Sequence, residues 1–165
     1  DMKEAQNVIQ ETRAAYIEPV RMVIPKIGTD VKVVNPENPD NTTLDAALLL
    51  GAVRYPGSGD LESARTMFLF GHSSYLPVVH NQAFKTFNGL QKLKAGDEIV
   101  VYGNEKEYRY RVEKVELVNA DEGFVNLAAD DRKLVLATCN SFGKKQERYI
   151  VTADFVGSDR IENSE

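Results

Sequence analysis

The chain has 165 residues, of which 42% are hydrophobic and 27% charged, and its net charge is −5. These proportions are ordinary for one globular domain and favour a folded chain over an intrinsically disordered one. The mild, dispersed charge gives no basic stripe for nucleic acid, and a single cysteine excludes an internal disulfide.

The first predicted element is a helix. Within residues 2–16, apolar side chains recur at steps of three and four, and good helix formers fill the gaps. Pro19 ends this pattern. Residues 21–34 then predict a short pair of strands, which Pro25 and Gly28 interrupt.

Loops alternate with apolar stretches in the next part of the chain. Residues 35–43 predict an exposed loop, because two prolines and three asparagines fall within them. Residues 44–51 fit either a helical turn or a buried segment, and residues 53–60 predict a turn-rich loop. The continuous apolar run at 66–74 predicts a fully buried strand.

A short helix is predicted around residues 83–93, because Phe84, Phe87 and Leu90 share one helical face. A turn then leads into a strand that ends near residue 103.

The last predicted strands carry an irregularity. Residues 106–118 alternate apolar and polar side chains, but the apolar set changes register between Val112 and Val115, which indicates a bulge or bend. Residues 132–138 and 148–156 predict the final strands. Seven or eight short strands without strand–helix alternation predict an all-β fold with minor α, either a closed barrel or a sandwich.

Three reactive side chains stand where an apolar strand meets a polar loop: His72, Cys139 and Arg148. If the last two strands pair antiparallel, Cys139 lies opposite Arg148, with about 5 Å between paired Cβ atoms. A cation at that distance lowers the pKa of a thiol and favours the nucleophilic thiolate. The same guanidinium can donate hydrogen bonds to an oxyanion.

His72 can supply the proton that a leaving amine needs when cysteine attacks an amide. At ordinary pKa values, only roughly one site in a hundred carries thiolate and imidazolium together at pH 7. The residues alone leave plainer interpretations open: an inert buried thiol, a structural histidine and a solvated edge arginine. His80 lies in a polar loop and is expected to be exposed.

No metal site or cofactor is expected. The acidic residues at 121, 122, 130 and 131 lack the spacing of a calcium loop and fit a solvated surface. One cysteine and two histidines give no zinc-binding pattern.

Several short motifs together resemble the sortase family. "LVLATCNSFGKKQER" resembles its Thr-Leu-x-Thr-Cys strand with the following arginine, and "FLFGHSS" resembles its Gly-His segment. "LQKLKAGDEIVVY", "IPKIGTDVKV" and "LLLGAVRYPGSG" resemble further family segments. The match is collinear from about residue 21 to residue 157.

The resemblance implies a role for each site residue. Cys139 is expected to be the nucleophile and His72 the general acid and base. Arg148 is expected to steer the substrate backbone and stabilise the oxyanion, and Thr138 to line the substrate groove.

The resemblance also implies a closed eight-stranded β-barrel over residues 20–158, with short connecting helices. The N-terminal helix is then a stalk within residues 1–19, and residues 159–165 are a frayed tail. The family's enzymes are cysteine transpeptidases that cut a sorting signal similar to Leu-Pro-x-Thr-Gly between Thr and Gly. They hold the product as a thioacyl-enzyme and pass it to an amine, such as that of a cell-wall precursor.

Such enzymes act outside the cell membrane, so the implied anchor lies outside this chain.

The sequence departs from the family pattern at two places. Val135 replaces the first threonine of the signature, and Ser73 and Ser74 follow His72 where many relatives carry arginine. The chain has no Asp-Pro-aromatic lid tripeptide of pilus-building members, which favours anchoring of surface proteins over pilin polymerisation. A hydrolytic cysteine protease on the same barrel and a non-catalytic peptide-binding barrel remain the alternatives.

Overall fold

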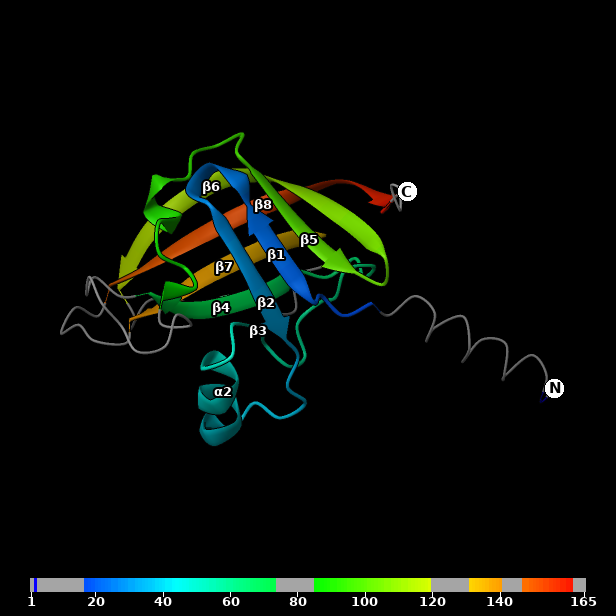
Figure 1. Ribbon diagram of the computed structural model, residues 1–165, viewed down its shortest axis with the longest axis horizontal. Helices are drawn as coiled ribbons and strands as arrows, with labels where there is room; N and C mark the ends of the chain where they lie inside the picture. The colour runs from blue at the N-terminus through cyan, green and yellow to red at the C-terminus, as the bar shows by residue number, and fades with distance from the viewer. Residues whose placement is uncertain (1, 3–16, 74–84, 120–130, 141–146, 162–165) are drawn as a thin grey trace.

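The chain folds as a closed β-barrel in a computed structural model (Figure 1). The structure describes residues 2, 17–73, 85–119, 131–140 and 147–161. Around the barrel the strand order is β1-β2-β3-β4-β7-β8-β6-β5. The described elements are β1 (Arg21–Ile24), η1 (Pro25–Ile27), β2 (Thr29–Val34), α2 (Asn41–Leu48), β3 (Ala52–Arg54), β4 (Met67–Ser73), η3 (Leu90–Lys92), β5 (Glu98–Gly103), β6 (Lys106–Asn119), β7 (Lys133–Asn140) and β8 (Glu147–Arg160).

The closed, mostly β barrel confirms the predicted fold class. The predicted break between β1 and β2 is also confirmed. Pro25 opens the short 3₁₀ helix η1, and Gly28 ends it with φ of 67°, a left-handed conformation that glycine adopts without strain. The predicted helix over 2–16 lies outside the described residues, apart from Met2.

The segment between β2 and β4 corrects the sequence analysis. Residues 44–51 were expected to be a helical turn or a buried segment, and α2 covers Asn41–Leu48. Asp40 caps this helix, since its carboxylate accepts the backbone N–H of Thr43 at 2.8 Å. The chain then forms β3, which was predicted as loop and pairs parallel to β2. A strand–helix–strand crossover therefore exists where none was predicted, because three residues are too short to show a strand period.

The second half of the barrel follows the prediction more closely. The register of the β6–β8 pairing shifts between Val112 and Lys114, as the change in apolar pattern indicated, and shifts again between Arg109 and Tyr110. The strand β8 continues to Arg160, beyond the predicted end at residue 156, because it stays paired with the start of β6. In the described part of the predicted helix around 83–93, Lys85 and η3 have 3₁₀ conformation and residues 86–89 form a turn, so no α-helix is present there.

Apolar side chains form two clusters, one inside the barrel and one outside it. The inner core consists of Ile17, Met22, Ile24, Val33, Ala52, Leu61, Met67, Leu69, Phe87, Leu90, Leu93, Ile99, Val101, Tyr108, Tyr110, Val112, Leu134, Leu136, Val151 and Ala153. The outer cluster consists of Ala47, Leu48, Val53, Phe70 and Ala137, with Val34, Leu44, Tyr55, Phe68 and Ile150 packed against it.

The two clusters explain the continuous apolar run of β4. Met67 and Leu69 belong to the inner core, while Phe68 and Phe70 alternate onto the outer cluster. Figure 1 shows α2 on the outside of the barrel next to β3, where its Ala47 and Leu48 help to cover that face. Both faces of β4 are therefore covered, as the run predicted.

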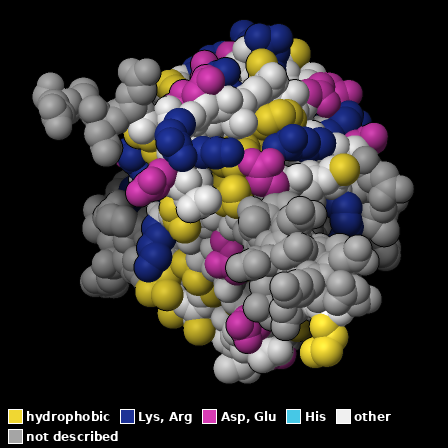
Figure 2. All heavy atoms as spheres, turned by 90° about the vertical axis from the view of Figure 1, so that its right-hand side faces the viewer, with side chains coloured by type: hydrophobic (Ala, Val, Ile, Leu, Met, Phe, Trp, Pro, Cys, Tyr) yellow, Lys and Arg dark blue, Asp and Glu magenta, His cyan; other side chains and the backbone are white. Residues whose placement is uncertain are grey.

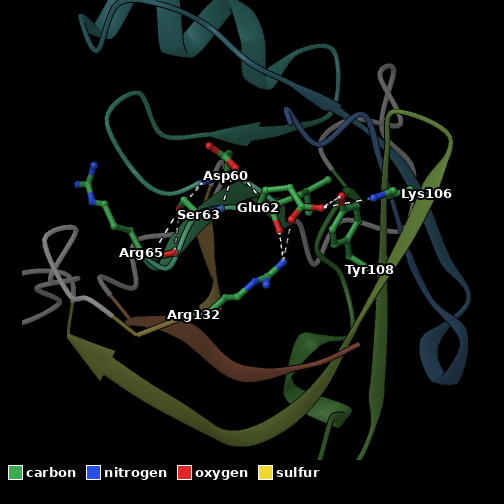
Figure 3. Close-up of polar contacts among 8 residues, drawn as sticks. Asp60, Glu62, Ser63, Arg65, Lys106, Tyr108 and Arg132 are labelled. Atoms are coloured by element: carbon green, nitrogen blue, oxygen red, sulfur yellow. Dashed lines mark hydrogen bonds and ion pairs between the residues drawn. The ribbon is translucent and has the colours of Figure 1, made fainter. Parts of the chain in front are cut away.

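One end of the barrel is closed by the loop before β4. Leu61 is fully buried there, and its backbone N–H donates to the carbonyl of Ile17 at 3.0 Å. Figure 3 shows the surrounding polar contacts, in which Tyr108 donates to Glu62. Arg132 donates to the Leu61 carbonyl at 2.6 Å. Burial, together with the Glu62 carboxylate, raises the pKa of Tyr108 above its ordinary value.

Charged side chains of both signs share the surface. Figure 2 shows lysine, arginine, aspartate and glutamate side chains interspersed over one face. Exposed ion pairs such as Arg21–Asp30 contribute to this mixture. Among the described residues no helix is both long and apolar enough to cross a membrane.

Candidate active site

Two neighbouring parallel strands bring His72 and Cys139 together. Strands β4 and β7 pair in register from Met67↔Leu134 to Ser73↔Asn140, and this register aligns His72 with Cys139 near the carboxyl ends of both strands. Neighbouring strands lie about 4.8 Å apart. The pairing therefore joins at one place two residues that are distant in sequence.

The alternation of β4 determines the face on which His72 stands. Phe68 and Phe70 pack on the outer cluster, and His72 follows at the next position of the same period. Its side chain is half-buried. In β7 the same period runs from Ala137 of the outer cluster to position 139. Positions 72 and 139 therefore follow the outer cluster on the same face of the sheet.

Arg148 stands at the start of β8. The β7–β8 pairing extends to Ala137↔Ile150, and continuing this register by two residues aligns position 139 with Arg148. On its other side Arg148 pairs with Val118 of β6, and its side chain is exposed. The backbone positions of all three predicted catalytic residues therefore fall on adjacent strands at one end of the barrel.

Thr138 is buried and contacts the backbone of β8. It is only 4% exposed, and its Oγ1 accepts the backbone N–H of Tyr149 at 3.0 Å. The last residue pair of the β7–β8 ladder, Ala137↔Ile150, comes just before this contact. The hydroxyl therefore joins β7 to β8 one residue before Cys139. A place for Thr138 in the substrate groove stays a prediction.

The other residues considered as functional candidates, His80 and the acidic residues, lie away from the carboxyl ends of β4 and β7 or outside the described residues. His80 and the acidic positions 121, 122 and 130 are outside them. Asp131 is exposed, and its carbonyl accepts the Thr66 hydroxyl at 3.0 Å. Within the described ranges, no group of three or more His, Cys, Asp or Glu residues could hold a metal ion.

Comparison with known proteins assigns the family. A model of the Sortase domain matches residues 22–156. The chain belongs to the sortase family. Sortases as a family are cysteine transpeptidases.

Relatives of this sortase include a curated protein and many solved structures. It is 29% identical to Sortase A of Bacillus anthracis over 140 residues, which cover 84% of this chain and 60% of that protein. The sortase C-1 structure from Actinomyces oris is 23% identical with a TM-score of 0.67, covering 83% of this chain and 73% of the other. Listeria monocytogenes sortase A is 19% identical with a TM-score of 0.64, covering 89% and 92%. The structural matches support the barrel fold, and the chain spans about 60% of the curated relative.

Sequence reasoning predicted that both faces of β4 are covered but did not identify which residues form the outer cluster beside the candidate site of this sortase. The outer cluster brings Val53 of β3, Phe70 of β4 and Ala137 of β7 together. Ile150 of β8 packs against the same cluster, two residues after Arg148. The signal was present in the apolar residues at both odd and even positions of β4 and β7, which require a cover on the outside of the barrel as well as a core within it.

Proposed function

We propose that this sortase cuts a sorting signal similar to Leu-Pro-x-Thr-Gly between Thr and Gly and joins the threonine carbonyl to an amine. The observation that carries the proposal is the in-register pairing of His72 with Cys139 on β4 and β7. Family membership supports the reaction class. On the face shown in Figure 2, acidic and basic side chains are interspersed and do not form the one-sided basic patch typical of nucleic-acid binding.

In the first half-reaction, the Cys139 thiolate attacks the threonine carbonyl carbon, and the carbonyl oxygen becomes an oxyanion. The C–N bond to glycine then breaks, and the glycine amine takes a proton from the His72 imidazolium. The products are a thioester on Cys139 and a peptide that begins with glycine. The proposal needs a thiolate and an imidazolium together, which adjacent strand positions favour by mutual attraction.

In the second half-reaction, an acceptor amine attacks the thioester carbonyl. Neutral His72 takes the proton that the amine loses, and the Cys139 thiolate leaves, so the enzyme returns to its initial charge state. Arg148 donates hydrogen bonds to the oxyanion in both steps and orients the substrate backbone. Its alignment with position 139 through the continued β7–β8 register supports this role.

The proposal includes the cellular setting. The donor is the sorting signal of a surface protein, and the acceptor is an amine of a cell-wall precursor. The domain acts on the extracellular face of the cell membrane as the ectodomain of an anchored protein. Family membership supports this setting, and the exposed, mixed-charge surface suits a domain that stands in solvent.

A peptide-transfer assay tests the proposal. The chain is incubated with a Leu-Pro-x-Thr-Gly peptide and a saturating amine, and the products are read by mass spectrometry. The proposal predicts the amide of the threonine fragment with the added amine, and no such product from Cys139→Ala. Hydrolysis alone at saturating amine would indicate the protease alternative. Transfer by the Cys139→Ala variant, or no cleavage at all, would contradict the proposal.

A further inference from the structure

The edge of β4 beside His72 has an unusual partner. Strand β3 pairs with β4 only at Val53↔Phe70 and Arg54↔Leu69, whereas β7 accompanies β4 to Ser73. The carbonyl of His72 instead accepts the backbone N–H of Phe87 at 2.9 Å. A residue from the segment that precedes η3 thus takes the place of β3 at this point.

The direction of that hydrogen bond follows from the alternation of the strand. The Phe68 carbonyl accepts the backbone N–H of Tyr55 at 2.9 Å, so Phe68 directs its backbone groups to the β3 side. Every second residue of a strand directs its backbone polar groups to the same side, which places the His72 carbonyl on that side as well. His72 is therefore held between Cys139 of β7 on one edge and Phe87 on the other.

Gly71 allows Phe87 to come this close. Phe87 is fully buried in the inner core, and a Cβ built on Gly71 would lie 3.2 Å from its Cγ and 3.3 Å from its Cδ1. The same Cβ would lie 3.2 Å from Cγ2 of Thr86. A methyl group at position 71 would therefore push the ring and its segment away from β4. In Figure 1 this segment, drawn in green, lies at the left end of the barrel, where β4 ends.

We propose that Phe87, seated against Gly71, is a positioning residue for His72. The inference rests on the proposed function, in which His72 moves protons for Cys139. The buried Phe87 ring anchors the segment that precedes η3. The Phe87 backbone N–H then holds the His72 carbonyl so that His72 stays in register with Cys139. Since displacement of a catalytic group by about 1 Å can reduce the rate about a hundredfold, loss of this anchor impairs chemistry more than substrate binding.

The test uses Gly71→Ala, which leaves the His72 side chain unaltered and brings a methyl against Phe87. We expect kcat of peptide transfer to fall about ten- to hundredfold while KM stays within about twofold. Two controls are matched to it. Gly157→Ala brings a methyl to 3.2 Å from the half-buried Arg109 guanidinium at the far end of β8, and should leave kcat unchanged. Ile99→Ala creates a cavity in β5, which is not adjacent to β4, and controls for lost stability.

A second readout is independent of turnover. In a His80→Gln background His72 is the remaining histidine, and NMR reports its ring resonances and titration midpoint. Gly71→Ala should shift both, whereas Ile99→Ala should not. If the wild-type chain transfers no peptide, the proposed function fails while this measurement still tests the position of His72. Ring resonances and kcat that match the wild type in Gly71→Ala would overturn the inference.

A double variant keeps the inference testable if Gly71→Ala folds poorly. Phe87→Leu retains an apolar anchor but removes part of the ring, which makes space for a methyl at position 71. We expect Gly71→Ala combined with Phe87→Leu to be more active than Gly71→Ala alone. Losses that simply multiply in the double variant would show that the two positions do not act through one contact, and would contradict the inference.

Discussion

The hydrogen bond from Tyr149 to Thr138 gives the sharpest prediction about the barrel wall. Thr138→Val keeps the shape of the side chain but removes the Oγ1 acceptor of the Tyr149 N–H. An unpaired donor in the interior costs about 1–3 kcal/mol, and because Tyr149 is half-buried we expect the low end, about 1 kcal/mol. For a chain of this length, that corresponds to a Tm lower by about 2–4 °C.

The effect on activity should exceed the effect on stability. Tyr149 follows Arg148 directly, so release of its N–H lets the start of β8 move away from β7. We expect kcat/KM for peptide transfer to fall about ten- to hundredfold, as for other displaced catalytic groups. Thr138→Ser is the matched control, because it loses a buried methyl worth about 0.8 kcal/mol but keeps the hydroxyl.

Two measurements decide the matter: urea denaturation of each variant, and initial rates of transfer in conditions where each is folded. The two substitutions should reduce stability to a similar extent, while only Thr138→Val loses activity. A Thr138→Val variant with wild-type kcat/KM, or a Thr138→Ser variant equally impaired, would refute the reasoning.

Three further predictions concern separate parts of the molecule. Leu61→Ala should lower the unfolding free energy by about 2–5 kcal/mol in urea titration. It should leave kcat of the folded protein unchanged, because Leu61 lies at the opposite end of the barrel from His72 and Cys139. A large fall in kcat would count against that separation. Hydrogen bonds from Lys26 and from the Lys94 backbone lower the pKa of Asp97, so its stabilisation is complete above the unfolded pKa of about 3.9 and is lost as the pH falls through the lower folded value. Asp97→Asn should therefore lower Tm more at pH 7 than near pH 2, and an equal decrease at both pH values would exclude this cause. Arg148→Lys should reduce kcat about a hundredfold or more because lysine lacks the planar fork of donors, and near-wild-type turnover would remove Arg148 from the mechanism.

Local sequence patterns predicted those parts of the fold that depend on neighbouring residues. Pro25 and Gly28 marked the break between β1 and β2. Proline restricts the backbone conformations allowed at its own position, and glycine widens them. The change of apolar register after Val112 marked the irregularity in β6, because strand faces alternate with a period of two. Likewise, the apolar run at 66–74 indicated that both faces of β4 are covered.

Long-range pairing was beyond such patterns. The parallel pairing of β4 with β7 joins residues separated by 67 positions in the case of His72 and Cys139, and nothing near either residue encodes that partner. The site was therefore predicted from the collinear family motifs rather than from periodicity. For the same reason β3 was missed, since its three residues pair with β2 and β4 without a period of their own.

The environment of the site shows a further limit. Gly71 in "FGH" was assigned no structural role, because the ring that requires its missing side chain belongs to Phe87, sixteen residues later. Thr138 was assigned to a groove from its motif, and its hydroxyl contact with Tyr149 emerged only from the register of β7 and β8. In both cases the decisive contact joins strands or segments that local sequence does not relate.

Covalent labelling tests the central claim most directly. A Leu-Pro-x-Thr peptide that carries a vinyl sulfone in place of the scissile bond is incubated with the chain, and intact mass is measured before and after. The account predicts one added peptide per chain, located on Cys139, with labelling strongly slowed in His72→Ala and absent in Cys139→Ala. A chain that stays unlabelled, or a Cys139→Ala variant that gains the same mass, would contradict it.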